Sequence, residues 1–224
     1  MTTVGAGARR GLADKRRAIL RGALAVFARE GYTRASIDLI AREAGVSTRT
    51  IYNHFRDKAA LFETVIQESA QRVAEEQIAE MDRHLAQVGE GPEALEQALL
   101  AFGRAHAQPT AGEHFALVRQ IQAEVLHIPA EALEAWQETG PRRVQRALAG
   151  HLARFTAEGR LREADPHRTA RHLVLLAAGE VTSRSFHGAV PLPEAEIDTI
   201  VATGVDAFLR AYAPDRICAA QPGS

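Results

Sequence analysis

A short segment of this 224-residue chain, AREAGVSTRTIYNHF at residues 41–55, concentrates polar side chains that suit contacts with an external partner. A guanidinium can donate two parallel hydrogen bonds to the edge of a guanine, and threonine can contact a phosphate or a thymine methyl group. Arg49 is therefore a candidate for reading bases. Ser47, Thr48 and Thr50 are candidates for further contacts beside it.

A second set of hydrogen-bond donors follows closely in the sequence. Tyr52, His54 and Lys58 can bind backbone phosphates, which position a protein on a duplex without reading its sequence. Ser36 precedes an apolar-periodic stretch and is an N-cap candidate. Ser36 and Asn53 complete the predicted DNA-binding residues.

Two short helices separated by a glycine would hold these side chains. The sequence predicts one helix from Ile37 to about Ala44 and a second that begins near Thr48. The small residues Ala41 and Gly45 allow two helices to cross steeply and to be joined by a sharp turn. Such a helix-turn-helix inserts its second helix into the major groove of DNA. A solvated helix surface, the alternative, does not explain the small residues and their apolar neighbours.

Composition is typical of a globular protein, with 46% hydrophobic and 25% charged residues. No apolar run approaches the roughly 18 residues of a membrane-spanning helix. The single cysteine, Cys218, cannot form an internal disulfide, which fits a reducing compartment. We therefore expect a cytoplasmic protein without a membrane segment.

Charge is unevenly distributed along the chain. Residues 1–60 hold 12 Lys and Arg against 5 Asp and Glu, whereas residues 61–224 hold 15 against 23. A basic first quarter joined to an acidic remainder indicates that one segment meets a polyanion and the other does not. Charged faces are often merely solvated, so this pattern supports the DNA hypothesis without establishing it.

The remaining periodicity predicts an all-α protein of about nine helices. A first helix is expected from about Asp14 to Glu30, and a long helix with Asp57 as its cap follows the short pair. Beyond a break at residues 89–92, further helices are expected at about 93–108, 113–127, 129–158 with a kink or split at Gly140-Pro141, 166–187 and 193–212.

Residues 14–62 resemble the N-terminal domain of TetR-family repressors. The resemblance rests on an amphipathic first helix followed by GYTRASIDLIAREAGVSTRTIYNHFRDKAALF at residues 31–62. The matching positions are Gly31-Tyr32, Ser36, Ile40-Ala41, Ala44-Gly45-Val46-Ser47, Tyr52, Phe55, Lys58 and Leu61. The resemblance implies that Tyr52 and Lys58 hold DNA phosphates.

Residues 115–173 are similar to the AefR-like version of the family's C-terminal domain, which implies a dimer and a cavity for a small-molecule inducer. The expected organisation is a flexible basic arm at 1–13, a helix-turn-helix DNA-binding domain at 14–60, a C-terminal helical bundle for ligand binding and dimerisation at 61–213, and a disordered tail at 214–224.

A homodimer is also expected from DNA geometry, because one helix-turn-helix reads only half of a two-fold site. The last two predicted helices carry apolar stripes that would form a four-helix interface with a second copy, or would fill the core of a single chain. The predicted interface residues are Leu176, Ile197, Val201, Val205 and Phe208.

Candidates for the ligand pocket are polar residues within apolar helices and two aromatic residues: Phe115, Arg119, Gln122, Trp136, Glu180 and Arg184. Glu180 and Arg184 stand one helical turn apart, so an ion pair between them is the simpler structural explanation. Phe115 and Trp136 are also the kind of residue that fills an ordinary core.

The sequence therefore favours a repressor that a small molecule releases from operator DNA. The alternative is a DNA-binding regulator without a ligand, whose C-terminal half only dimerises or binds another protein. A metal-binding enzyme is a remote third hypothesis. Glu124 and His127 form one Glu-x-x-His motif, whereas a di-iron bundle needs two such motifs and two further carboxylates. We expect no catalytic residue, no metal and no cofactor.

Overall fold

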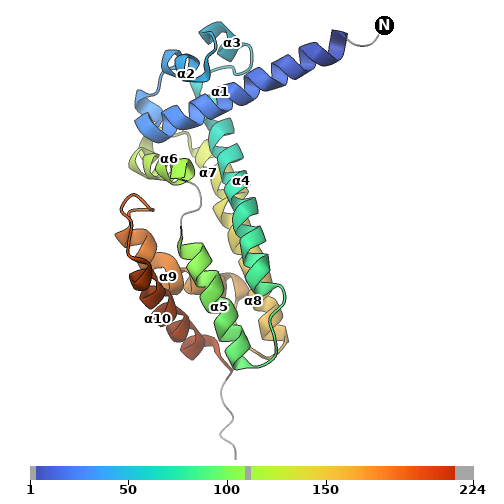
Figure 1. Ribbon diagram of the computed structural model, residues 1–224, viewed down its shortest axis with the longest axis vertical. Coiled ribbons are helices and arrows are strands. Elements are labelled where there is room, and N and C mark those ends of the chain that lie inside the picture. Colours follow the sequence, from blue (N-terminus) through green and yellow to red (C-terminus); the bar gives the residue numbers. More distant parts are fainter. Residues whose placement is uncertain (1–3, 109–111, 215–224) are drawn as a thin grey trace, which may run out of the picture. The chain divides into compact units, whose positions relative to one another are not determined.

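The computed structural model describes residues 4–108 and 112–214, and these residues are helical with short connections (Figure 1). The helices are α1 (Val4–Arg34), α2 (Ile37–Ala44), α3 (Thr48–Tyr52), α4 (Lys58–Leu85), α5 (Pro92–Ala107), α6 (Gly112–Ala123), a 3-10 helix η1 (Val125–His127), α7 (Ala130–Thr139), α8 (Pro141–Ala157), α9 (Pro166–Arg184) and α10 (Glu194–Tyr212). Within the described ranges no strand is present, which agrees with the all-α prediction.

Most differences from the expected helices lie at their ends. The helix α1 begins at Val4 rather than near Asp14, so the part of the expected flexible arm that is described is helical. The expected helix at 129–158 is divided into α7 and α8 at Gly140, one of the two outcomes expected at Gly140-Pro141. Helix α9 ends at Arg184 instead of His187. The expected tail beyond Pro214 lies outside the described residues.

The chain forms two compact units, and the first contains segments from both sides of the domain boundary expected at residue 60. The first unit contains the described residues up to Ala74 together with Gly112 to Arg142, and the second contains the remainder. Helices α6 and α7 therefore pack with the helix-turn-helix, although the sequence assigned them to the C-terminal domain. Packing on α1 explains this grouping, because α6 lies against α1 (Figure 1).

The first unit has one continuous apolar core. Phe27 of α1 and Phe62 of α4 meet edge to face, with ring centroids 4.9 Å apart. Ile51 of α3 is completely buried in the same core, and so are Ile19 and Ile40. Helix α3 has only five residues, too few for a helix to be stable alone in water. Its position therefore depends on burial of Ile51.

In the second unit, α10 packs closely on α5 and α9. A Cβ atom on Gly204 would overlap the Leu176 carbonyl oxygen, so α9 and α10 approach closely only because this residue is glycine. Gly103 of α5 has a similar role, because an added Cβ would lie 2.7 Å from a methyl carbon of Val201. Among the described helices none is both long and apolar enough to cross a membrane.

Candidate nucleic-acid interface

Helix α2 is delimited by two local features that the sequence predicted. The Ser36 hydroxyl accepts a hydrogen bond from the Leu39 backbone N–H at 3.2 Å and caps the N-terminus. At the other end Gly45 adopts the left-handed conformation, with φ 66°. An added Cβ on Gly45 would meet no atom within 4 Å, so backbone conformation rather than space requires glycine there. Ser36 thus fixes the start of α2, and Gly45 fixes the turn that leads from α2 to α3.

Helix α3 begins with a second serine cap. The Ser47 hydroxyl accepts from the Thr50 backbone N–H at 3.1 Å and lies 2.8 Å from the Thr50 hydroxyl. Ser36 and Ser47, both predicted as DNA contacts, therefore also hold the ends of the two helices. Thr50 already has an internal hydrogen-bond partner through its hydroxyl group.

The outward side chains of α3 form the candidate interface. Arg49 and Asn53 are exposed, and Tyr52 has 57% of its surface accessible. Thr48 and His54 are half-buried at its edges. Arg49 makes no ion pair within the described part of the chain, so its guanidinium is available to a partner. Base reading by Arg49 remains a prediction that this exposure permits.

Lys58 makes contacts within the chain itself. Its ammonium group donates to the Tyr32 and Ala35 carbonyl oxygens at 2.9 and 3.0 Å, and to the Thr33 carbonyl at 3.4 Å. It also lies 4.7 Å from the centroid of the Tyr32 ring. An ammonium has three donors, and all three are directed at these carbonyls. Lys58 therefore attaches the start of α4 to the end of α1 and to Ala35, and the expected phosphate contact stays a prediction.

One residue of the motif was missed by the sequence analysis. Gly22 of α1 faces Ala44 of α2, and an added Cβ would lie 2.8 Å from the Ala44 backbone nitrogen. The close approach of α1 to the end of α2 thus requires glycine. The only sequence signal was a glycine inside an otherwise strongly amphipathic helix, which indicates a packing role without naming the partner.

Comparison with known families decides the classification. Residues 97–214 match the family described as AefR-like transcriptional repressor, C-terminal domain, and residues 19–65 match the tetR family of bacterial regulatory proteins. The chain belongs to the TetR family. This membership places it with transcriptional regulators rather than enzymes, so the metal-binding enzyme hypothesis is set aside.

Relatives of this TetR-family chain are found among curated proteins and solved structures. The transcriptional repressor Rv1474c of Mycobacterium tuberculosis is 43% identical over 63 residues, which cover 28% of this chain and 34% of that protein. The match thus spans about a third of that relative's length.

Two solved structures cover most of the chain. A TetR-family transcriptional regulator from Mesorhizobium loti is 28% identical, with a TM-score of 0.76 over 90% of this chain and 98% of that one. The flavonoid-responsive regulator FrrA is 29% identical, with a TM-score of 0.66 over the same shares of the two chains. The resemblance to solved regulators therefore extends well beyond the helix-turn-helix.

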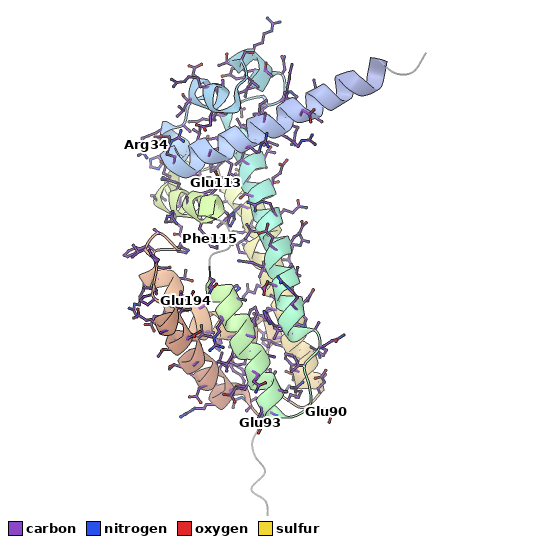
Figure 2. The ribbon with its side chains drawn as sticks, in the orientation of Figure 1. Arg34, Glu90, Glu93, Glu113, Phe115 and Glu194 are labelled. Carbon is purple, nitrogen blue, oxygen red and sulfur yellow. The ribbon has the colours of Figure 1, made fainter. Side chains whose placement is uncertain are left out.

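The residues predicted to line a ligand pocket are divided between the two units. Phe115 (Figure 2), Arg119 and Gln122 lie on α6 and Trp136 on α7, all in the first unit. Gln122 is exposed and Trp136 is buried. In the second unit Glu180 and Arg184 form an exposed ion pair at 3.0 Å, and Arg184 also contacts Glu196. The simpler explanation offered for Glu180 and Arg184, an ion pair, is confirmed.

The predicted dimer interface of the TetR-family chain needs correction. The side chains of Val201, Val205 and Phe208 are completely buried within a single chain. A second copy cannot contact them, because α5 and α9 already cover this face of α10. Ile197 is half-buried, whereas 41% of Leu176 on α9 is accessible. Of the five predicted residues, Leu176 is the best placed to contact a partner.

The position of Lys58 leads to a prediction about stability. Lys58→Ala leaves three carbonyl groups without their donor, so the free energy of unfolding should fall by about 1–3 kcal/mol. Chemical denaturation monitored by circular dichroism measures this change. The control Lys15→Ala removes an exposed lysine and should alter stability by less than about 0.5 kcal/mol. If Lys58→Ala weakened DNA binding at unchanged stability, the phosphate role would be supported.

Proposed function

We propose that this chain is a homodimeric transcriptional repressor that binds operator DNA and is released by a small molecule. The presentation of Arg49, Tyr52 and Asn53 on an exposed helix carries the DNA-binding part of the proposal. The two serine caps and buried Ile51 fix that helix before DNA arrives, so little ordering remains to oppose binding. Such a regulator would act in the cytoplasm, where its DNA is.

The base-reading role of Arg49 gives the main test of this function. Arg49→Ala should reduce affinity for the preferred operator by about 1–3 kcal/mol and relax base preference at one position in each half-site. Selection from a random duplex library, performed with both proteins, measures the preference. The control Arg168→Ala removes an exposed arginine of α9 and should leave the selected sequence unchanged. Identical selected sequences for the wild type and Arg49→Ala would exclude base reading by this residue.

Exposed apolar residues support dimerisation through α9. Leu175 and Leu176 are exposed near the middle of the helix, and Phe186 is exposed just beyond its end. A groove of about 610 Å³ between α9 and α10 is lined by Leu176, Thr199 and Thr203. Contiguous exposed apolar groups of this kind mark interaction sites in soluble proteins. A second copy related by two-fold symmetry would cover this face and provide the second recognition helix.

The dimer is tested by a charge on that face. Leu176→Glu should produce monomers, because an unpaired carboxylate would be buried in the interface. Light scattering reports the mass, and circular dichroism shows whether the fold is kept. Leu126→Glu is the matched control, since Leu126 is 92% exposed in the 3-10 helix of the first unit. A folded dimer of Leu176→Glu would place the interface elsewhere.

A buried donor in the first unit supports a ligand. The indole N–H of Trp136 is buried and has no hydrogen-bond partner among the residues that the structure describes. Leaving such a donor unsatisfied costs about 1–3 kcal/mol, which a ligand carrying an acceptor would recover. FrrA, which is similar over nearly its whole length, is named as flavonoid-responsive. A flavonoid offers an aromatic body and oxygen acceptors, so this chemical class suits the surroundings of Trp136.

The same unit offers a route from ligand to DNA. Trp136 shares its apolar core with Ile51 of the recognition helix. Directly after α6, the carboxylate of Glu124 accepts hydrogen bonds from the Thr33 backbone N–H at 2.8 Å and the Thr33 hydroxyl at 3.1 Å. Helix α6 is therefore attached directly to the end of α1. A ligand that shifts α6 or α7 would displace the scaffold of α3 and favour a conformation with lower DNA affinity.

The ligand hypothesis is tested by calorimetry with flavonoid aglycones. Trp136→Phe keeps the ring but removes the N–H, and the loss of one neutral hydrogen bond should weaken flavonoid binding about 2- to 10-fold. Arg49→Ala is the control and should bind the flavonoid like the wild type, because the two sites are separate. If the wild-type protein binds a flavonoid, saturating flavonoid should lower its affinity for the operator by some factor. Because coupling is reciprocal, operator DNA must lower the affinity for the flavonoid by the same factor. A wild-type protein that binds none of them would favour the regulator without this ligand class.

A further inference from the structure

The N-terminal part of α1, residues 4–21 and here called the extension, is cationic, and its described side chains before Ile19 are mostly exposed. Residues 11–17 are all exposed, whereas burial in the core begins at Ile19. Residues 4–21 contain six Lys and Arg but one acidic residue, Asp14. In Figure 1 this part of α1 extends past α2 and α3. Formation of the core does not account for a helix that buries so little surface.

The contact between α1 and α2 shows which face of the extension lies beside the recognition motif. Gly22 lies against Ala44, which immediately precedes the turn into α3. Lys15 stands seven residues before Gly22, which places it on nearly the same face, about 10 Å further along the helix. Arg21 borders the same face. The two cations therefore flank the helix-turn-helix on the side of its turn.

These two cations differ from their neighbours Arg16 and Arg17, which form ion pairs. Arg16 forms an ion pair with Glu68 at 3.0 Å, and Arg17 pairs with Asp14. Within the described residues, neither Lys15 nor Arg21 takes part in an ion pair. The charge of Lys15 and Arg21 is thus available to an external anion.

We propose that the extension of α1, residues 4–21, is a second DNA-binding element, in which Lys15 and Arg21 bind phosphates flanking the half-site read by α3. The inference rests on the proposed DNA-binding function and extends its footprint. From Gly22 to Val4 the helix spans about 27 Å, equivalent to about eight base pairs along one strand. Phosphate contacts of this kind add affinity that depends on salt but not on sequence.

The composition of the extension favours DNA over a membrane surface as the polyanion. A helix that lies on a membrane needs a broad apolar face to insert between lipids. Residues 11–17 read GLADKRR and include only Leu12 and Ala13 as apolar side chains other than glycine. Such a helix can be attracted to phosphates but has almost no apolar surface to insert.

The experiment measures how DNA affinity depends on salt. Operator duplexes are first selected with the wild-type protein and then made with and without about eight flanking base pairs on each side, the span estimated above. Fluorescence anisotropy is measured across salt concentrations for the wild type and for Lys15→Gln/Arg21→Gln. The control Arg168→Gln/Arg171→Gln removes the same charge from exposed positions of α9, which also lack an ion pair in the described structure.

The proposal expects a shallower salt dependence for Lys15→Gln/Arg21→Gln. Each lost phosphate contact should reduce the slope of log affinity against log salt by about 0.9, with the selected sequence unchanged. Removing the flanks should weaken the wild type and the control but not this variant. A variant with the slope of the control would overturn the inference while leaving the proposed function intact. If the wild-type protein bound no DNA sequence specifically, both the inference and the proposed function would be overturned. If Lys15→Gln/Arg21→Gln weakened binding to anionic vesicles but left DNA binding unchanged, the extension would be assigned to membranes and the inference would be overturned.

Discussion

A single apolar core joins the recognition helix to α7, and the geometry of the candidate interface depends on it. Ile51 of α3, Phe62 of α4, Ile121 of α6 and Trp136 of α7 all belong to this core. Protein interiors are packed densely enough to transmit strain rather than absorb it. The position of α3 therefore cannot change independently of α6 and α7. In this unit, the recognition helix α3 and the helices α6 and α7, which are expected to contact a ligand, are packed around the same core.

The end of α1 and its connection to α2 are held by two side chains of opposite charge. Lys58 donates to the carbonyl oxygens of Tyr32 and Ala35, while Glu124 accepts from the Thr33 N–H. Gly31 makes room for the Glu124 carboxylate and adopts a φ of 79°, which a side chain rarely tolerates. Lys58 at the start of α4 and Glu124 directly after α6 thus bind the same short segment. A movement of α4 or α6 would therefore displace the residues that lead into α2, the first helix of the helix-turn-helix.

Local features of the fold were predictable from sequence, because short-range hydrogen bonds determine them. Ser36 and Ser47 cap their helices as their positions indicated, and Asp57 accepts from the Ala60 N–H at 2.8 Å at the start of α4. This hydrogen bond lowers the pKa of Asp57 and favours the charged cap. Each of these contacts spans three residues, so spacing alone reveals it.

Long-range contacts were not predictable in the same way. A lysine at a helix start gives no sign in the sequence that carbonyls 23 to 26 residues earlier will bind it, as happens for Lys58. The apolar stripe of Val205 and Phe208 indicated burial but not whether the same chain or a second copy supplies the cover. Likewise, the start of α1 at Val4 lies outside the amphipathic pattern, because an exposed helix has no apolar face to reveal it. Sequence periodicity shows that a helix face is buried, and the structure shows which element covers it.

The brevity of α3 has a consequence for how such a regulator can diverge. Folding constrains this helix mainly at Ser47 and Ile51, with the Thr50 hydroxyl bound to Ser47. Arg49, Tyr52 and Asn53 carry no part of the core, so their replacement leaves the stability of the protein nearly untouched. A duplicated copy of the gene could therefore acquire a new operator through a few substitutions on this face, without passing through an unfolded intermediate in its evolution.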